Sequence, residues 1–208
     1  MTDRHLPKII LASGSPQRQA LLRKAGYHFE VLPPGPDAEA DLPSVGKAEE
    51  LVAQMALRKA HDVADQLASG KQGDGMAASP LLLVACDTLA ECQGERLGKP
   101  RDDADARRML ELLSGHDHEV HSGLCLWPWP RGEPVVRAAM SRLHMDALSP
   151  QQIDEYLASG QWMGKAGAFG YQDRVGWLHL VEGSESNVIG LPLELLAQMV
   201  GELDISRE

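Results

Sequence analysis

The chain has 208 residues, 43% of them hydrophobic and 24% charged, so it can bury the core of one domain or of two fused lobes. Its formal net charge of -10 at pH 7 argues against a protein that tracks a polynucleotide, because long-range electrostatics repel the phosphate backbone. A small phosphorylated ligand is compatible with this charge, since a metal, local cations or backbone amides can invert the field within one site.

The N-terminal segment and the cysteines predict the compartment. The first residues lack a basic stretch followed by an apolar core, and no later apolar run has membrane-spanning length. We therefore expect a cytoplasmic protein without a membrane partner. Cys86, Cys92 and Cys125 cannot all pair within one chain and contain no CxxC spacing, so we expect reduced thiols and no structural zinc.

The first part of the chain alternates between strand and helix signals. The helix signals are a cap, an N-terminal proline, a terminating glycine and apolar residues at helical spacing. In chain order, the expected elements are a strand at 8–12, a helix from Ser15 as cap to Gly26 as terminator, a strand at 28–32, a loop to about Gly46, a helix at 49–67 and a flexible linker at about 69–80.

The apolar run at residues 81–86 predicts a strand buried on both faces, with Asp87 at its exit. The elements expected after it are a hairpin around Gly94, a helix from Asp102 to Leu113, strands at about 119–126 and 135–145, and helices at 150–158 and 191–203. Alternating strands and helices with a long hairpin predict an α/β fold around a mixed sheet.

The start of the first expected helix has the features of an anion site. Residues 13–18, SGSPQR, place hydroxyls and Arg18 where a strand feeds a helix N-terminus, whose free amides and dipole favour phosphate. An ordinary capped helix with a solvated arginine accounts for the same residues. The segment alone leaves both interpretations open.

Asp87 and Lys99 fit chemistry on a phosphorylated ligand. A carboxylate that follows six largely apolar residues must be satisfied by solvent, a metal or hydrogen bonds, and Thr88 adds a hydroxyl beside it. Lys99 lies within LGKP, where Gly98 permits close backbone approach, and lysine is a common phosphate partner. A strand-end acid without further function is the alternative for Asp87.

Two further segments have polar side chains that suggest a metal site or a base-binding site, and both also have an ordinary structural explanation. On a strand, His116 and His118 point to one face and His121 to the other, so HDHEVH is not expected to form a zinc centre. Lys165 begins KAGAFGY, and Gln172 after it can donate and accept hydrogen bonds as a base edge does. A glycine-rich connection packed with aromatic side chains is the alternative there.

Six segments occur in a fixed order: LASGSPQRQALL, VACDTLA, LGKP, LSGHDHEV, KAGAFGYQ and NVIGLPL. In this order they resemble the Maf family over about residues 9–196. The resemblance implies one Maf-like domain over residues 1–208, with an elongated mixed β-sheet, flanking helices and a two-lobed cleft, similar to inosine triphosphate pyrophosphatases. It also implies a homodimer and hydrolysis of a nucleoside triphosphate to the monophosphate and pyrophosphate, assisted by Mg²⁺ or else Mn²⁺ or Co²⁺.

The resemblance assigns roles to individual residues. Asp87 is similar to the family's catalytic acid, which accepts the proton from water close to the metal, and Lys99 is similar to its phosphate-binding lysine. The positions that resemble the family's substrate-binding residues are Ser13, Ser15, Arg18 and Lys165. Replacement of Asp87 by asparagine is expected to abolish hydrolysis and to leave the melting temperature within a few degrees.

Two departures from the family pattern concern specificity and the metal. Gln17 replaces the first arginine of the SPRR pattern, at a position associated with choosing the base. The family has an acidic pair shortly after its second strand, where this chain has PGPDAEAD, so Glu39 or, as the alternative, Asp37 stands in as the second metal-binding acid. Thr88 and Gln172 resemble the subgroup that prefers dTTP and UTP.

These resemblances predict hydrolysis of dTTP and UTP with tolerance of CTP, because the amide of Gln17 offers a donor and an acceptor. A Maf-type enzyme for modified nucleotides such as 7-methyl-GTP is one alternative. A nucleotide-binding regulator of cell division and septum formation without turnover is another. The intact Asp87 and Lys99 favour turnover.

Overall fold

The computed structural model describes residues 7–39, 46–70, 80–173 and 175–203, apart from the side chains of Glu39 and Gln172. None of the helices in these residues is long and apolar enough to cross a membrane. The elements are β1 (Lys8–Leu11), α1 (Pro16–Lys24), β2 (Phe29–Val31), α2 (Pro36–Glu39), α3 (Ala48–Ala68), β3 (Leu81–Cys92), β4 (Glu95–Leu97), α4 (Asp103–Leu113), β5 (Asp117–Trp129), β6 (Val135–Met145), α5 (Pro150–Ala158), the 3-10 helices η1 (Ala166–Ala168) and η2 (Tyr171–Asp173), β7 (Leu178–Glu182), α6 (Glu185–Ile189) and α7 (Leu193–Glu202).

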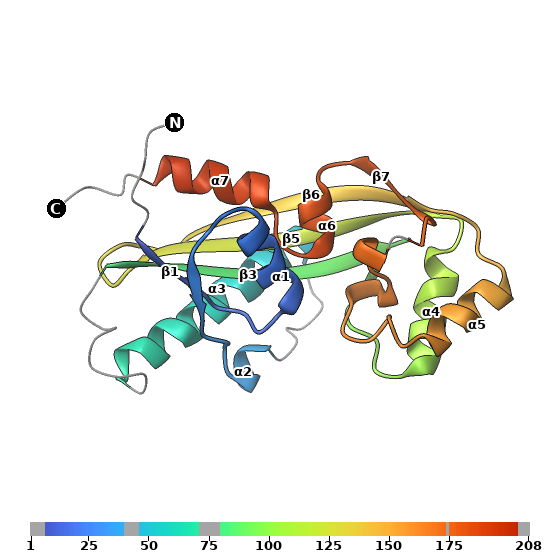
Figure 1. The fold of residues 1–208 in the computed structure, drawn as a ribbon, viewed down its shortest axis with the longest axis horizontal. Helices are drawn as coiled ribbons and strands as arrows, with labels where there is room; N and C mark the ends of the chain where they lie inside the picture. Colours follow the sequence, from blue (N-terminus) through green and yellow to red (C-terminus); the bar gives the residue numbers. More distant parts are fainter. Residues whose placement is uncertain (1–6, 40–45, 71–79, 174, 204–208) are drawn as a thin grey trace. The chain divides into compact units, whose positions relative to one another are not determined.

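The strands of the described residues form one seven-stranded sheet with the order β2-β1-β3-β5-β6-β7, in which β4 also pairs with β3. β1 is parallel to both β2 and β3, whereas β4 is antiparallel to β3 and β7 is antiparallel to β6. Helices pack against this mixed sheet (Figure 1). The expected α/β class is confirmed.

The chain divides into two compact units. Unit 1 comprises Met1–Asp87, Gly123–Ala138 and Leu193–Glu208, and unit 2 comprises Thr88–Ser122 and Ala139–Pro192. The strands β3, β5 and β6 each contribute residues to both units. The single domain and the two-lobed cleft stay predictions.

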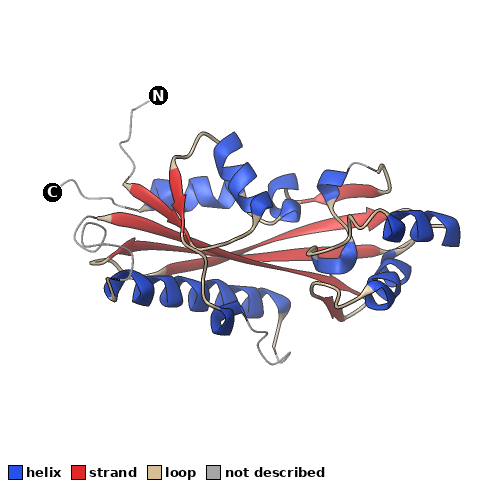
Figure 2. Ribbon diagram, turned by 60° about the horizontal axis from the view of Figure 1, so that its bottom comes forward, coloured by secondary structure: helices blue, strands red, loops and turns tan. Residues whose placement is uncertain are grey.

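In unit 1, helices cover both faces of the sheet, with α3 on one face and α1 and α7 on the other (Figures 1 and 2). Ile10, Leu83 and Ala85 belong to the core against α3. Ile9 and Leu82, which alternate with them and point to the opposite face, are also buried. Burial on both faces explains why β3 begins as a continuous apolar run.

Gly123 allows α3 to lie close to the sheet. A Cβ at this position would lie 2.1 Å from the carbonyl oxygen of Val52, so a larger residue requires the helix to move. The stripe of α3 that faces the sheet core includes Ala56, Ala60 and Val63. Lys59 is also buried on this helix, one position from Ala60.

In unit 2, α4 and α5 lie side by side (Figure 1) and are joined by an ion pair between Arg107 and Asp154. Their buried residues join the strands in one core, which includes Met109, Leu110, Val120, Leu143 and Ile153. Within unit 2, the first residues of β5 alternate between buried and more exposed side chains. This strand segment is therefore packed mainly on one face.

Some boundaries differ from the sequence-based expectations. β3 continues to Cys92, so Asp87 lies within a strand and not at its exit, because the second half of β3 pairs with β4. The expected hairpin is present, with positive φ at Gln93 and Gly94. The short elements α2, α6, β7, η1 and η2 were not expected, and most of the predicted linker at 69–80 lies outside the described residues.

Candidate functional site

Residues 13–18 form a hydrogen-bonded corner at the start of α1. Ser13 is 2% exposed, and its Oγ accepts bonds from the amide of Ser15 at 3.2 Å and from Nη1 of Arg18 at 3.1 Å. Ser15 caps the helix by accepting from the amide of Arg18 at 3.4 Å, and it donates to Oε1 of Gln17 at 3.0 Å. The guanidinium is therefore held at the end of a helix where an anion is favoured.

Parallel pairing of β1 with β3 brings this corner to the end of the strand pair at which Asp87 lies. Leu11 pairs with Val84, and the amide of Ala12 donates to the carbonyl of Val84 at 2.8 Å. The chain after β1 therefore runs beside the residues of β3 that lead to Asp87. Strand pairing within unit 1 joins two motifs that are far apart in the sequence.

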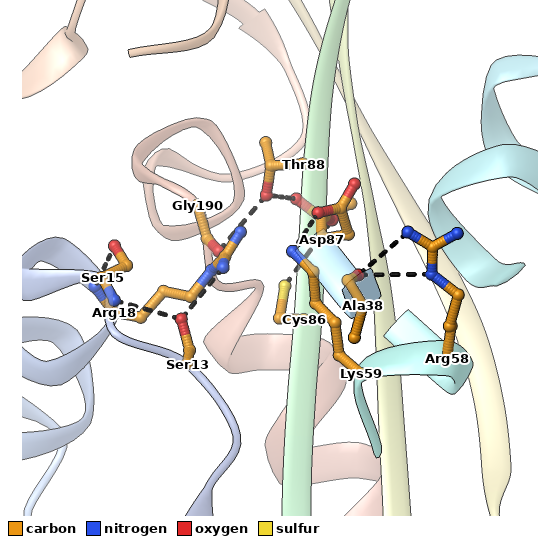
Figure 3. Close-up of polar contacts among 11 residues, drawn as sticks. Ser13, Ser15, Arg18, Ala38, Arg58, Lys59, Cys86, Asp87, Thr88 and Gly190 are labelled. Atoms are coloured by element: carbon orange, nitrogen blue, oxygen red, sulfur yellow. Dashed lines mark hydrogen bonds and ion pairs between the residues drawn. The ribbon is translucent and has the colours of Figure 1, made fainter. Parts of the chain in front are cut away.

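Asp87 forms an ion pair with a buried lysine that the sequence analysis missed. Nζ of Lys59 lies 2.6 Å from Oδ1 of Asp87, and the side chains are 4% and 20% exposed (Figure 3). Asp87 points toward α3 because it shares a strand face with Leu83 and Ala85. The sequence contained a signal for this pair, because Lys59 lies within the apolar stripe of α3, where a buried charge requires a partner.

The second oxygen of Asp87 distinguishes this pair from a purely structural one. Oδ1 is held by Lys59, whereas Oδ2 has no hydrogen-bond partner among the described residues. A partly exposed carboxylate oxygen held in a fixed position can accept a proton from water or bind a hard divalent cation. The arrangement suits the role that the family resemblance assigns to Asp87.

The second acid expected at a metal lies on α2. Asp37 is exposed, and the side chain of Glu39 lies outside the described residues. Two bonds from Arg58 to the carbonyl of Ala38, at 3.3 and 3.2 Å, tie α2 to α3 (Figure 3). In the part of the chain that the structure describes, no three His, Cys, Asp or Glu side chains are grouped to hold a metal. The choice between Asp37 and Glu39 stays a prediction.

In unit 2, the hydroxyl of Thr88 is bonded within the protein. Its Oγ1 lies 2.9 Å from Oγ of Ser122 and donates to the carbonyl of Gly190 at 3.3 Å (Figure 3). These bonds fix the NVIGLPL segment next to β3 and β5. The expected role of Thr88 in specificity stays a prediction.

The segments of Lys99 and Lys165 are joined in unit 2. The amide of Gly167 donates to the carbonyl of Gly98 at 3.0 Å. Gly167 has a φ of +70°, which favours glycine, and a Cβ there would meet Ala90 at 3.4 Å. Lys99 is exposed next to this contact. The structure therefore brings the LGKP and KAGAFGY motifs together.

Lys165 is paired with an acid that the sequence analysis did not identify. Its Nζ lies 2.5 Å from both oxygens of Asp173, and the side chains are 13% and 8% exposed. Tyr156 donates to Oδ2 of Asp173 at 2.6 Å, and burial, together with this bond, raises the pKa of Tyr156. Asp173 directly follows Gln172, whose side chain lies outside the described residues.

The histidines and cysteines behave as ordinary structural residues. His118 is buried, whereas His121 lies on the opposite face of β5 and bonds to Glu119 at 3.0 Å. All three cysteines are buried, and burial raises the pKa of Cys125 to about 12. Cys125 is therefore protonated and unreactive at neutral pH.

Comparisons with known proteins show which family the chain matches. The Maf-like protein family matches residues 8–203. A protein of Rhodopirellula baltica named dTTP/UTP pyrophosphatase is 45% identical over 201 residues, which are 96% of this chain and 84% of that protein. One of Geotalea uraniireducens with the same name is 39% identical over 186 residues, 89% of each chain. The solved Staphylococcus aureus Ham1 protein is similar with 15% identity and a TM-score of 0.48 over 94% of this chain and 99% of that chain.

Proposed function

Since the chain belongs to the Maf-like protein family, we propose that it is a nucleoside triphosphate pyrophosphatase that converts dTTP and UTP to the monophosphate and pyrophosphate. The observation that carries the proposal is the ion pair of Lys59 with Asp87, which leaves one carboxylate oxygen for chemistry. The names of the similar proteins support the choice of substrates.

Asp87 acts as the general base in this proposal. Lys59 holds Oδ1, so Oδ2 is oriented to accept the proton of a water that attacks the α phosphorus. The bond between the α phosphorus and the bridging oxygen breaks, and pyrophosphate leaves. A positioned base of this kind contributes about 10² to 10⁴ in rate.

Cations and helix amides bind the phosphates in the proposed complex. Arg18, held by Ser13, and the N-terminus of α1 favour an anion in unit 1. Lys99 supplies an exposed positive charge in unit 2. A reaction that concentrates negative charge on the leaving group needs such compensation.

A divalent cation, Mg²⁺ or else Mn²⁺ or Co²⁺, is part of the proposal. The free oxygen of Asp87 is a hard donor that fits such an ion, and Glu39 or Asp37 is the proposed second protein ligand. When bound, the ion supplies charge neutralisation on the triphosphate. Loss of activity in excess chelator, with recovery on addition of Mg²⁺, is expected. Full activity in chelator contradicts the metal requirement.

Gln17 is the proposed base reader, with Thr88 and Gln172 as further specificity residues. Because Ser15 donates to Oε1 of Gln17, one lone pair of that oxygen is used, whereas both Nε2 donors remain to meet the base. Arginine at this position would offer only donors. The bond therefore favours the carbonyl-rich edges of thymine and uracil, and tolerance of CTP stays a prediction.

Pyrophosphate release from a panel of triphosphates tests the function. The highest kcat/KM is expected for dTTP and UTP, with lower values for CTP and 7-methyl-GTP. Nucleotide binding without pyrophosphate release from any member of the panel identifies the non-catalytic regulator instead. A maximum at 7-methyl-GTP identifies the enzyme for modified nucleotides.

The cytoplasmic location and the homodimer implied by the family resemblance also belong to the proposal. Analytical ultracentrifugation is expected to show a dimer. A monomer at micromolar concentration contradicts the proposed homodimer and leaves the proposed activity unaffected. Fractionation of cells is expected to recover the protein with the cytosol.

A further inference from the structure

The ion pair of Lys165 with Asp173 has a geometry that the proposed reaction does not yet explain. Asp173 accepts two short contacts from Lys165 and a third hydrogen bond from Tyr156. Only 8% of its side chain is exposed. The negative charge of Asp173 is therefore balanced by groups of unit 2.

Aromatic side chains pack against Tyr156, the hydrogen-bond partner of Asp173. The ring of Tyr156 lies 4.9 Å from that of Phe169, and Phe169 stacks on Trp177 at 5.9 Å. Tyr156 comes from α5, whereas Asp173 comes from η2. The bond between them ties the glycine-rich segment to a helix, so the carboxylate has little freedom to move.

Lys165 is the member of the pair that can reach a ligand. An ammonium has three N–H donors, and the two oxygens of Asp173 take two of them. Among the described residues, no further acceptor is bonded to Nζ. One donor is thus left, and its direction is set by the other two bonds. The pair as a whole carries no net charge.

We propose that Asp173 is a positioning residue that acts through Lys165 on the nucleotide. It orients the remaining N–H of Lys165 and cancels its charge, so that Lys165 donates to an uncharged oxygen of the nucleoside and does not bind the phosphate chain. A neutral pair attracts a polyphosphate far less than an isolated cation does, whereas its hydrogen bond to a carbonyl or hydroxyl is retained. The inference rests on the proposed function and assigns Lys165 to one part of the substrate.

A double-mutant cycle tests whether Asp173 acts through Lys165. The proteins are the wild type, Asp173→Asn, Lys165→Met and the double variant, and calorimetry measures the Kd of UMP and of a non-hydrolysable UTP analogue. Each single substitution is expected to weaken both ligands about tenfold. In the Lys165→Met background, Asp173→Asn is expected to change either Kd by less than about twofold.

Two outcomes overturn the proposal. If Asp173→Asn weakens binding by the same factor with and without Lys165, Asp173 is only a structural brace. If the loss caused by Lys165→Met grows from UMP to the UTP analogue, Lys165 is a phosphate cation.

Variants within the same unit serve as controls. Asp154→Asn removes the acid partner of Arg107 at the surface, so it is expected to leave both Kd values unchanged. Tyr156→Phe keeps the ion pair and removes one bond to Asp173, so it provides a milder substitution if Asp173→Asn does not fold. Tyr156→Phe is expected to raise the Kd of both ligands by the same few-fold factor. The proposal is overturned if Tyr156→Phe raises Kd by this factor in the Lys165→Met background as well.

The calorimetric readout separates this inference from the proposed function. A wild type that releases no pyrophosphate refutes the proposed function, whereas nucleotide binding still tests Asp173. Activity of the wild type together with an uncoupled cycle refutes only the inference. Absence of binding to any nucleotide overturns both.

Discussion

Each unit of the molecule contains a buried ion pair of lysine and aspartate, and the two pairs expose opposite members. In unit 1, Lys59 is 4% exposed and Asp87 is 20% exposed. In unit 2, Asp173 is 8% exposed and Lys165 is 13% exposed. Asp87 is therefore the more exposed member of the first pair and Lys165 that of the second. In our proposals the first pair supplies a base and the second a donor, because packing decides which partner is the more exposed.

The surroundings of β3 explain where the exposed carboxylate occurs. The residues Leu81–Cys86 are buried, and the next three residues are half-buried. Asp87 is the first residue after the fully buried run. A charge at this point can be held by a buried lysine on one side and still reach water on the other.

Breaking the pair of unit 1 is expected to have the largest effect. Asp87→Asn should lower kcat for UTP by about 10² to 10⁴, because the base is lost. It also removes the charge that pairs with the buried Lys59, so the free energy of unfolding should fall. Thermal unfolding therefore tests the sequence-based expectation of an almost unchanged melting temperature. Pyrophosphate release and thermal unfolding measure the two effects.

The double variant Lys59→Met, Asp87→Asn separates catalysis from stability. It removes both charges of the pair, so hydrolysis should stay absent, and its melting temperature relative to that of Asp87→Asn measures how far the loss of the Asp87 charge destabilises the fold. Hydrolysis at the wild-type rate in either variant contradicts the assignment of Asp87 as the base.

Lys99 and Lys165 differ in charge compensation within unit 2. Lys99 is an exposed cation, whereas the charge of Lys165 is neutralised by Asp173. Lys99→Ala should raise KM for UTP about tenfold, as expected for loss of a charged hydrogen bond. The loss of affinity should grow from UMP to a UTP analogue. Cys92→Ala and His121→Ala serve as controls, and equal effects in all three variants contradict the phosphate role.

Substitutions at the start of α1 should have a smaller, selective effect. Ser15→Ala leaves both lone pairs of the Gln17 carbonyl oxygen to accept from the amino group of cytosine, so kcat/KM for CTP relative to UTP should rise about threefold. Gln17→Arg should lower this ratio below that of the wild type, since arginine offers only donors. A ratio unaffected by Ser15→Ala shows that Gln17 does not read the base.

The smallest expected effect concerns the pH dependence of stability in unit 2. Burial, the largest cause, lowers the pKa of His118 below its ordinary value of 6.5. The unfolded chain therefore binds a proton at this residue as the pH falls through about 6.5, whereas the folded chain resists protonation. Its contribution to stability is complete above that pH and decreases below it.

His118→Leu should reduce the fall in melting temperature between about pH 7.5 and about pH 5.5. The exposed His28 provides a control in unit 1, where His28→Asn should leave the fall unchanged. An identical fall in the wild type and in His118→Leu contradicts the buried, neutral state of His118.

Elements with a clear periodic pattern could be predicted closely from the sequence. Strand β6 has the expected bounds, and α5 spans the expected residues 150–158. The short elements α2, α6 and β7 could not be predicted, because a few residues contain too little of any period. Asp87 seemed to end its strand because the residues after it, TLAEC, lack the continuous apolar run of the first half.

The sequence by itself determined the family, the α/β class and the motifs that contain Asp87, Lys99 and Lys165, because each motif is local and their order is distinctive. Only the tertiary structure decided which charges are paired. Lys59 is 28 residues from Asp87 in the chain, and the pair forms because α3 packs on β3. Lys165 pairs with Asp173, and Tyr156 bonds to Asp173, through the fold of unit 2. Ion pairing depends on distance and burial in space, and neither leaves a period or a spacing in the sequence.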